Sequence, residues 1–212
     1  MATYFLYSFS NAKYFKKSSI KLSNLAEIKS GYLFRSRLTK DIKGNVKVVQ
    51  LKDVDSNGNL NLNDLITINS IQKERGHFLQ DGDVIFKAKS NRHVAVVFRS
   101  GMKNGITTLH YFVLSLKNSN ILPEYLAWYL NQKPAQKYFH SNAAGTRIPI
   151  INKQILSELN ISVIPLEKQQ RVIEIHKLMC KENGLVKQIA EKRKKLYDCL
   201  LLMLANGNNK YQ

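Results

Sequence analysis

Apolar residues near the end of the chain recur at helical spacing. From Val172 to Met203 they follow one another at steps of three, four or seven positions, as on one face of a helix. Pro165 stands just before this pattern and just after the strand-like run 161–164. Because proline lacks a backbone donor and has a helical φ, it can end a strand and occupy the first position of a helix. The pattern predicts a helix over 165–205.

A heptad repeat describes the apolar face of this helix. With Ile175 at position a, seven of the nine a and d positions are apolar, and the breaks fall at Glu182 and Lys192. Forty residues would give a rod of roughly 60 Å, longer than a domain of this size needs to cover its core, so we expect a partner. The residues predicted to contact that partner are Ile175, Leu178, Leu185, Ile189, Leu196 and Met203.

The sequence favours one form of pairing and leaves others open. Polar residues at core positions lower stability but fix register, and Glu, Lys and Cys there disfavour a tight parallel zipper. An antiparallel pair, formed with a second copy of the chain, fits better. One alternative is a surface helix packed along its own domain. Gly184 and the basic run 192–195 also permit a break or a solvated tail.

Upstream of this helix the signals are mainly those of β-strands. Strands are predicted over 46–51, 84–88, 94–98 and 111–116, with turns at 57–58, 81–82 and 104–105. Helices are predicted over 123–131 and 134–142. The expected fold class is α+β, with one globular mixed α/β domain followed by a long coiled-coil-type helix. The expected divisions are an N-terminal appendage at 1–20, the globular domain at 21–164, the helix at 165–205 and a disordered tail at 206–212.

The charge of the chain indicates a polyanionic partner. Lys and Arg number 33 against 15 Asp and Glu, which gives a formal net charge of +18, while 44% of residues are hydrophobic and suffice for a core. Residues 1–163 hold 23 of the basic and 10 of the acidic residues, so most of the excess lies in the globular part. A soluble domain this basic usually binds a polyanion. A general lysine bias in composition is the alternative explanation.

Three segments combine cations with side chains that can read bases. A polar stretch after residue 31, a short segment after the predicted strand at 84, and a turn of small residues at 144–149 each place such side chains together. For any single residue, an ordinary solvated charge remains an equally good reading. The candidate DNA contacts are Arg35, Arg37, Lys40, Lys43, Lys87, Lys89, Asn91, Arg92, His93 and Arg147.

The order of motifs along the chain resembles a known family. The end of the globular part has Gly145-Thr146, a short element at 150–159, and Ile-Pro-Leu-Glu-Lys-Gln-Gln-Arg-Val-Ile at 164–173. This is similar to the end of a target recognition domain that runs into its spacer helix, in the specificity subunit of type I restriction-modification systems. Further segments resemble the family in the same order, at 22–31, 49–54, 79–89 and 123–130.

The resemblance implies a function for the chain. It implies a non-catalytic subunit that binds double-stranded DNA sequence-specifically and directs separate methyltransferase (modification) and restriction subunits. Family members typically carry two recognition domains and two spacer helices, whereas this sequence has one of each, like half a subunit. A homodimer would read a symmetric bipartite sequence. The alternative is a non-specific nucleic-acid-binding adaptor, for DNA or RNA, that dimerises through its helix.

The sequence offers little support for catalysis, metal binding or membrane insertion. It has no methyltransferase motif of the Asn-Pro-Pro-Tyr kind, no Gly-x-Gly cofactor loop and no Walker-type loop, so we expect no cofactor. His176 and Cys180 have metal-ligand spacing, but two further ligands are missing, so we expect no metal site. The two cysteines, Cys180 and Cys199, suggest buried thiols in a reducing compartment. Without an export signal or a long apolar run, we expect a cytoplasmic protein with no membrane contact.

Overall fold

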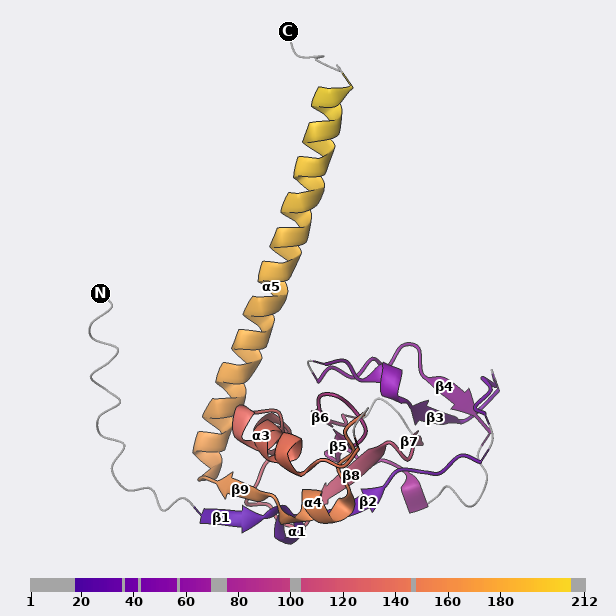
Figure 1. Cartoon of the computed structure of the whole chain (residues 1–212), viewed down its shortest axis with the longest axis vertical. Coiled ribbons are helices and arrows are strands. Elements are labelled where there is room, and N and C mark those ends of the chain that lie inside the picture. Colours follow the sequence, from indigo (N-terminus) through magenta and orange to yellow (C-terminus); the bar gives the residue numbers. More distant parts are fainter. Residues whose placement is uncertain are drawn as a thin grey trace, which may run out of the picture. The chain divides into compact units, whose positions relative to one another are not determined.

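A computed structural model describes residues 18–35, 37–41, 43–56, 58–69, 76–99, 104–145 and 148–206. The chain divides into two compact units, Met1–Gln170 and Arg171–Gln212 (Figure 1). The first unit holds all the strands of the described chain, and the described part of the second is helix up to Ala205. The predicted α+β class with a long C-terminal helix is confirmed.

The first unit is built on a four-stranded antiparallel sheet. Its strands stand in the order β2-β8-β5-β6. Their bounds are β2 Ala26–Ser30, β5 Val84–Lys87, β6 Ala95–Val97 and β8 Tyr111–Leu116. Ile85, Tyr111 and Val113 join one apolar cluster, whereas Phe86 lies 5.0 Å from Phe139, measured between ring centroids. Because side chains alternate along a strand, the sheet is buried on both faces.

Two smaller sheets complete the strands. A three-stranded sheet has the order β4-β3-β7, in which β3 pairs antiparallel with β4 and parallel with β7. A two-stranded sheet joins β1 to β9. Their bounds are β1 Ser18–Lys21, β3 Val46–Val49, β4 Ile66–Ile68, β7 Gly105–Thr107 and β9 Asn160–Val163. Since β1 pairs with β9, the globular unit begins before the predicted boundary at residue 21.

Short helices cover the first unit. The helices are α1 Leu22–Leu25, the 3₁₀ helix η2 Leu51–Asp53, α2 Pro123–Leu130, α3 Lys133–Asn142 and α4 Lys153–Glu158. Pro123 at the start of α2 and Pro134 near the start of α3 have a φ that suits the first helical turn. The Asn152 side chain caps α4 by accepting a bond from the Ile155 amide at 2.8 Å. Helices were predicted at 123–131 and 134–142, within one residue of α2 and α3.

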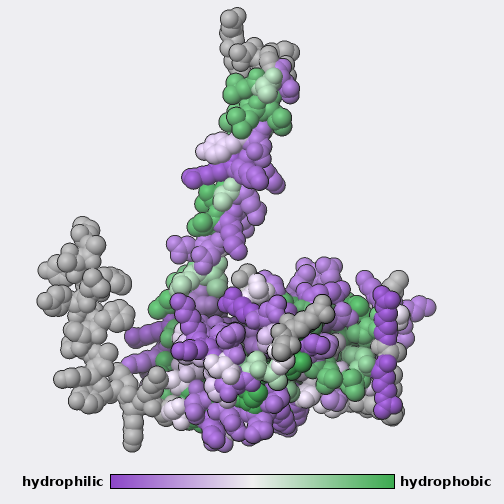
Figure 2. Space-filling model, in the orientation of Figure 1, coloured by the Kyte–Doolittle hydropathy of each residue, from purple (hydrophilic) through white to green (hydrophobic). Residues whose placement is uncertain are grey.

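The long helix α5, Leu166–Ala205, continues without a break through Gly184 and the basic run 192–195. Its large apolar side chains from Ile175 onward are exposed, and Figure 2 shows hydrophobic and hydrophilic areas alternating along it. Cys180 and Cys199 are both exposed, so the expectation of buried thiols is wrong for the single chain. In the described part of the chain, no helix is both long enough and apolar enough to span a bilayer. The predicted tail from 207 onward lies outside the described residues.

Candidate nucleic-acid interface

Four backbone segments, distant in sequence, meet around the turn Thr108–His110. The Tyr32 amide donates to the Thr107 carbonyl at 2.8 Å. The Ala88 amide donates to the His110 carbonyl, and the Ile151 amide donates to the Ala88 carbonyl, both at 2.9 Å. We call the segments 31–34, 88–92, 107–110 and 148–151 the loop platform. The platform brings two of the predicted DNA-contacting segments to either side of one turn.

A glycine permits the closest of these approaches. A Cβ atom added at Gly31 would lie 2.1 Å from the carbonyl oxygen of Thr108, which no side chain tolerates. The Gly31 amide donates to the Tyr111 carbonyl at 2.9 Å, and Tyr32 forms a parallel bridge with Thr108. Glycine at position 31 is therefore needed to hold the platform together.

Cations rim an apolar hollow of about 660 Å³ beside the platform. Its walls include Tyr32, Leu33, Phe34, Leu38 and Leu109, and the polar residues around it are Arg37, Gln50, Lys52, Thr108 and His110. Burial lowers the pKa of His110, and the positive charge of Lys89 lowers it further. The charge of Lys89 therefore acts on His110, which also lines the hollow.

The 31–45 segment carries four of the predicted contacts, and the structure leaves their charges exposed. Arg35, Arg37, Lys40 and Lys43 are all exposed. Asp41 anchors the segment to β4, because its amide donates to the Thr67 carbonyl at 2.9 Å. Within the described ranges, none of the four cations forms a salt bridge. They are available to an anionic partner.

The 87–93 segment divides into surface and interior residues. Asn91 and Arg92 are exposed and Lys89 is half-buried, and neither cation forms a salt bridge with another described residue. Lys87 instead directs its Nζ inward, to the carbonyls of Leu51 at 2.8 Å and Val54 at 3.0 Å. Burial lowers the pKa of Lys87, against the opposing charge of Asp55.

His93 is also an interior residue. Its side chain is only 4% exposed and its ring lies 5.8 Å from that of Phe139. Burial lowers the pKa of His93, while a bond to the Lys87 carbonyl opposes the shift. Lys87 and His93 thus both make contacts in the interior of the fold. We therefore leave both out of the proposed DNA contacts. Arg147 lies outside the described residues.

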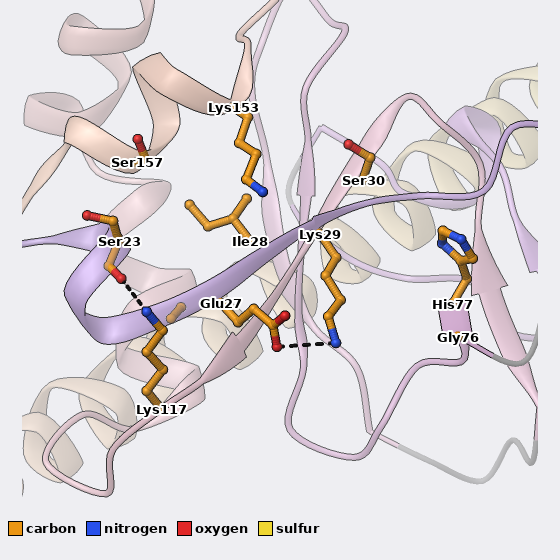
Figure 3. A pocket seen from close by; sticks show the side chains of 11 residues that line it. Ser23, Glu27, Ile28, Lys29, Ser30, Gly76, His77, Lys117, Lys153 and Ser157 are labelled. Carbon is orange, nitrogen blue, oxygen red and sulfur yellow. Dashed lines mark hydrogen bonds and ion pairs between the residues drawn. The ribbon is translucent and has the colours of Figure 1, made fainter.

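A second basic hollow, of about 490 Å³, lies beside β2 and was missed from the sequence (Figure 3). Lys29, Lys117 and Lys153 line it, together with His77 and three serines. Lys29 pairs with Glu27 at 3.2 Å and Lys117 donates to the Ser23 carbonyl at 2.7 Å, as the dashed lines in Figure 3 show. The three lysines come from distant parts of the sequence, so only the folded chain reveals the cluster.

The structure adds no ligands to the pair of residues with metal-ligand spacing. The Sγ of Cys180 lies 3.7 Å from Nε2 of His176. Across the described ranges, no group of three or more His, Cys, Asp or Glu side chains is placed to hold a metal ion. The loops of the first unit carry cationic and apolar side chains together.

Comparison with known proteins gives the family. Residues 15–194 match the family model described as "Type I restriction modification DNA specificity domain". The chain belongs to this family. The resemblance seen in the sequence is thereby confirmed over most of the length of the chain. No curated protein sequence matches the chain.

Solved structures share the fold of this specificity domain. The S subunit of a type I restriction-modification system from M. genitalium is 15% identical, with a TM-score of 0.56, over 94% of this chain and 48% of that one. The HsdS subunit from Thermoanaerobacter tengcongensis is 16% identical, with a TM-score of 0.62, over 88% and 47%. A chain solved for complex assembly and conformational transition of the type I R-M system is 16% identical, with a TM-score of 0.62, over 90% and 45%. The specificity domain spans about half the length of these structures.

Proposed function

We propose that this chain recognises a specific DNA sequence and directs separate methyltransferase and restriction subunits to it, without catalysing a reaction itself. The observation that carries the proposal is the convergence, in a member of the specificity-domain family, of two predicted cationic segments on the turn Thr108–His110. Specific binding needs base contacts as well as phosphate contacts. The platform offers Asn91 and Arg92 beside Lys89, and Arg37 lines the hollow next to it.

We assign the two basic surfaces different tasks. Lysine binds phosphate as a point charge, whereas arginine and asparagine form paired hydrogen bonds with guanine and adenine edges. Lys29, Lys117 and Lys153 around the second hollow therefore suit phosphates, and Arg37, Asn91 and Arg92 suit bases. If about six cations neutralise phosphates, affinity falls by about three orders of magnitude between 50 and 200 mM salt.

The helix supplies the proposed contact with other chains. Ile175, Leu178 and Leu185, which share the predicted seam, line one shallow groove on α5. Ile189, Leu196 and Met203 continue the seam as exposed apolar residues. We infer that this seam pairs with a second copy of the chain. Such a dimer carries two loop platforms, and it would read two half-sites related by a twofold axis.

The proposal is tested by selecting bound sequences from a pool of random DNA duplexes at about 150 mM salt, where non-specific electrostatic binding is weak. We expect enrichment of two inverted half-sites at a fixed spacing. Enrichment of a single half-site would support sequence recognition by this chain and would contradict the homodimer. Failure to enrich any sequence, with or without the methyltransferase subunits, would overturn sequence recognition and favour the non-specific adaptor.

A further inference from the structure

The loop platform exposes four large apolar side chains. Leu33, Leu109, Ile148 and Ile150 are exposed by 59%, 47%, 44% and 41%. In the described part of the first unit, the one other large apolar side chain with comparable exposure is Leu166, at 44%. The exposed apolar surface of the globular unit is therefore concentrated on the segments where its cationic loops meet.

These four side chains belong to one connected surface. Leu33 and Leu109 line the same hollow, and the parallel bridge between Tyr32 and Thr108 holds their backbones side by side. Ile150 bridges to Lys89. The next amide, that of Ile151, donates to the Ala88 carbonyl, whose own amide donates to the His110 carbonyl. The exposed leucines and isoleucines thus lie on segments that adjoin the one carrying Lys89 and Arg92.

The surrounding charge indicates what covers this apolar surface. Arg37 borders the hollow, and Lys89 and Arg92 stand on the neighbouring segment without a salt bridge to any described residue. A partner that covers the leucines must also neutralise these cations. DNA has both properties in its major groove, because phosphates line the groove and the C5-methyl of thymine is the apolar group on its base edges.

We propose that the apolar side chains of the loop platform, with Leu109 at its centre, contact thymine methyl groups in the major groove. This inference rests on the proposed function and deepens it. Arginine and asparagine select guanine and adenine, whereas the leucines and isoleucines select A·T pairs through the methyl of thymine. The recognised half-site therefore contains at least one thymine that the protein reads through its methyl group.

The test replaces thymines of the selected site, one at a time, by deoxyuridine, which pairs with adenine in the same way and lacks only the methyl. One buried methyl contributes about a three- to fivefold change in affinity. We expect at least one replacement to weaken binding of the unaltered protein by this factor. The measurement is the Kd for each duplex at fixed salt.

Protein variants test which side chain contacts the thymine methyl group. Leu109→Ala should bind the original site more weakly and should bind thymine and deoxyuridine equally at the sensitive position. Leu166→Ala removes an equally exposed leucine that lies outside the platform, and it should keep the full discrimination. Leu33→Ala, Ile148→Ala and Ile150→Ala test the other three apolar side chains of the platform. One of these variants should lose the discrimination if its side chain, and not Leu109, contacts the methyl.

Two outcomes would overturn the inference and leave the proposed function in place. In one, a specific site is selected, but no deoxyuridine replacement changes affinity, as for side chains inserted into the minor groove. In the other, sensitivity to the methyl persists undiminished in the Leu33, Leu109, Ile148 and Ile150 variants. Failure of the proposed function is a separate result, because no specific site would then be selected at all.

Discussion

The imidazole of His93 stacks on the ring of Phe86, with ring centroids 5.9 Å apart and ring planes 17° from parallel. Its Nδ1 lies 3.1 Å from the carbonyl of Lys87, while Nε2 is buried without a hydrogen-bond partner in the described part of the chain. The stack holds the loop with Lys89 and Arg92 against the sheet. A second proton on this ring would place a charge among aromatic side chains.

We therefore predict that His93 makes the stability of the fold depend on pH. Its pKa in the folded state lies below the unfolded value of about 6.5, so the unfolded chain binds the proton first. The free energy of unfolding is unaffected by His93 above this value and falls as the pH drops below it, towards the folded pKa. Thermal melts between pH 7.5 and 5 measure the effect.

The control for this prediction compares two histidines. His93→Phe keeps an aromatic ring and removes the titrating group, so the variant should lose less stability than the unaltered protein as the pH falls. His140→Gln replaces an exposed histidine of α3 and serves as the control variant. Identical pH profiles for the unaltered protein and His93→Phe would contradict the prediction.

The same substitution at two neighbouring lysines should change two different properties, stability in one case and DNA binding in the other. Lys87→Met removes the donor to the Leu51 and Val54 carbonyls, and we expect a loss of about 1–3 kcal/mol in the free energy of unfolding. Lys89→Met should leave stability unchanged and weaken DNA binding. Urea denaturation and Kd measurements on both variants separate the roles. The assignment fails if Lys89→Met destabilises the fold as much as Lys87→Met does.

A buried glutamine fixes the start of α5, and its exposed neighbour provides the control. Gln169 is fully buried; it accepts from the Leu122 amide at 2.8 Å and donates to the carbonyls of Asn120 and Ile164 at 2.9 and 2.7 Å. Gln169→Leu leaves these groups unpaired, so we expect a loss of about 2–4 kcal/mol in the free energy of unfolding. Gln170→Leu should change it little. Equal melting temperatures for the two variants would contradict this role.

The sequence predicts those elements whose side chains carry a strong local pattern. The apolar runs of β5 and β8, the proline at the start of α2 and the seam of α5 are examples. The strands β4 and β7 were missed because each has three residues and gains its stability from pairing with β3, far away in sequence. Local patterns do not record such pairing.

The candidate site likewise has features that a local sequence pattern predicts and features that depend on contacts between distant segments. Cationic loops were visible in the sequence, but their meeting at Thr108–His110 depends on hydrogen bonds between distant segments. The alternation of side chains along β5 does indicate that Lys87 points inward, because Lys87 lies on the same side of the strand as the core residue Ile85. This signal was not used in the sequence prediction. Lys29, Lys117 and Lys153 carry no local signal, because each is a single lysine in a lysine-rich chain.

Arg92 of the platform and Arg37 of the hollow beside it should matter more for DNA binding than lysines on the helix. We expect Arg37→Ala with Arg92→Ala to weaken binding to the selected site far more than Lys192→Ala with Lys194→Ala, although each pair removes the same charge. A base-contacting arginine costs about 1–3 kcal/mol and relaxes specificity, whereas loss of a phosphate contact weakens all sequences alike. Kd values for specific and random duplexes measure both effects. Equal losses from the two pairs would refute the assignment.

The apolar seam of α5 should control the oligomeric state. Leu185 is exposed in the single chain and lines the groove with Ile175 and Leu178, so a partner that covers it must bury it. Leu185→Asp would place a charge in that contact, and we expect it to turn a dimer into a monomer while the melting of the globular unit stays unchanged. Asn183→Asp makes the same charge change off the seam and should leave the dimer intact. Light scattering gives the mass of each variant; if Leu185→Asp keeps the mass of the unaltered protein, the seam does not hold the dimer together.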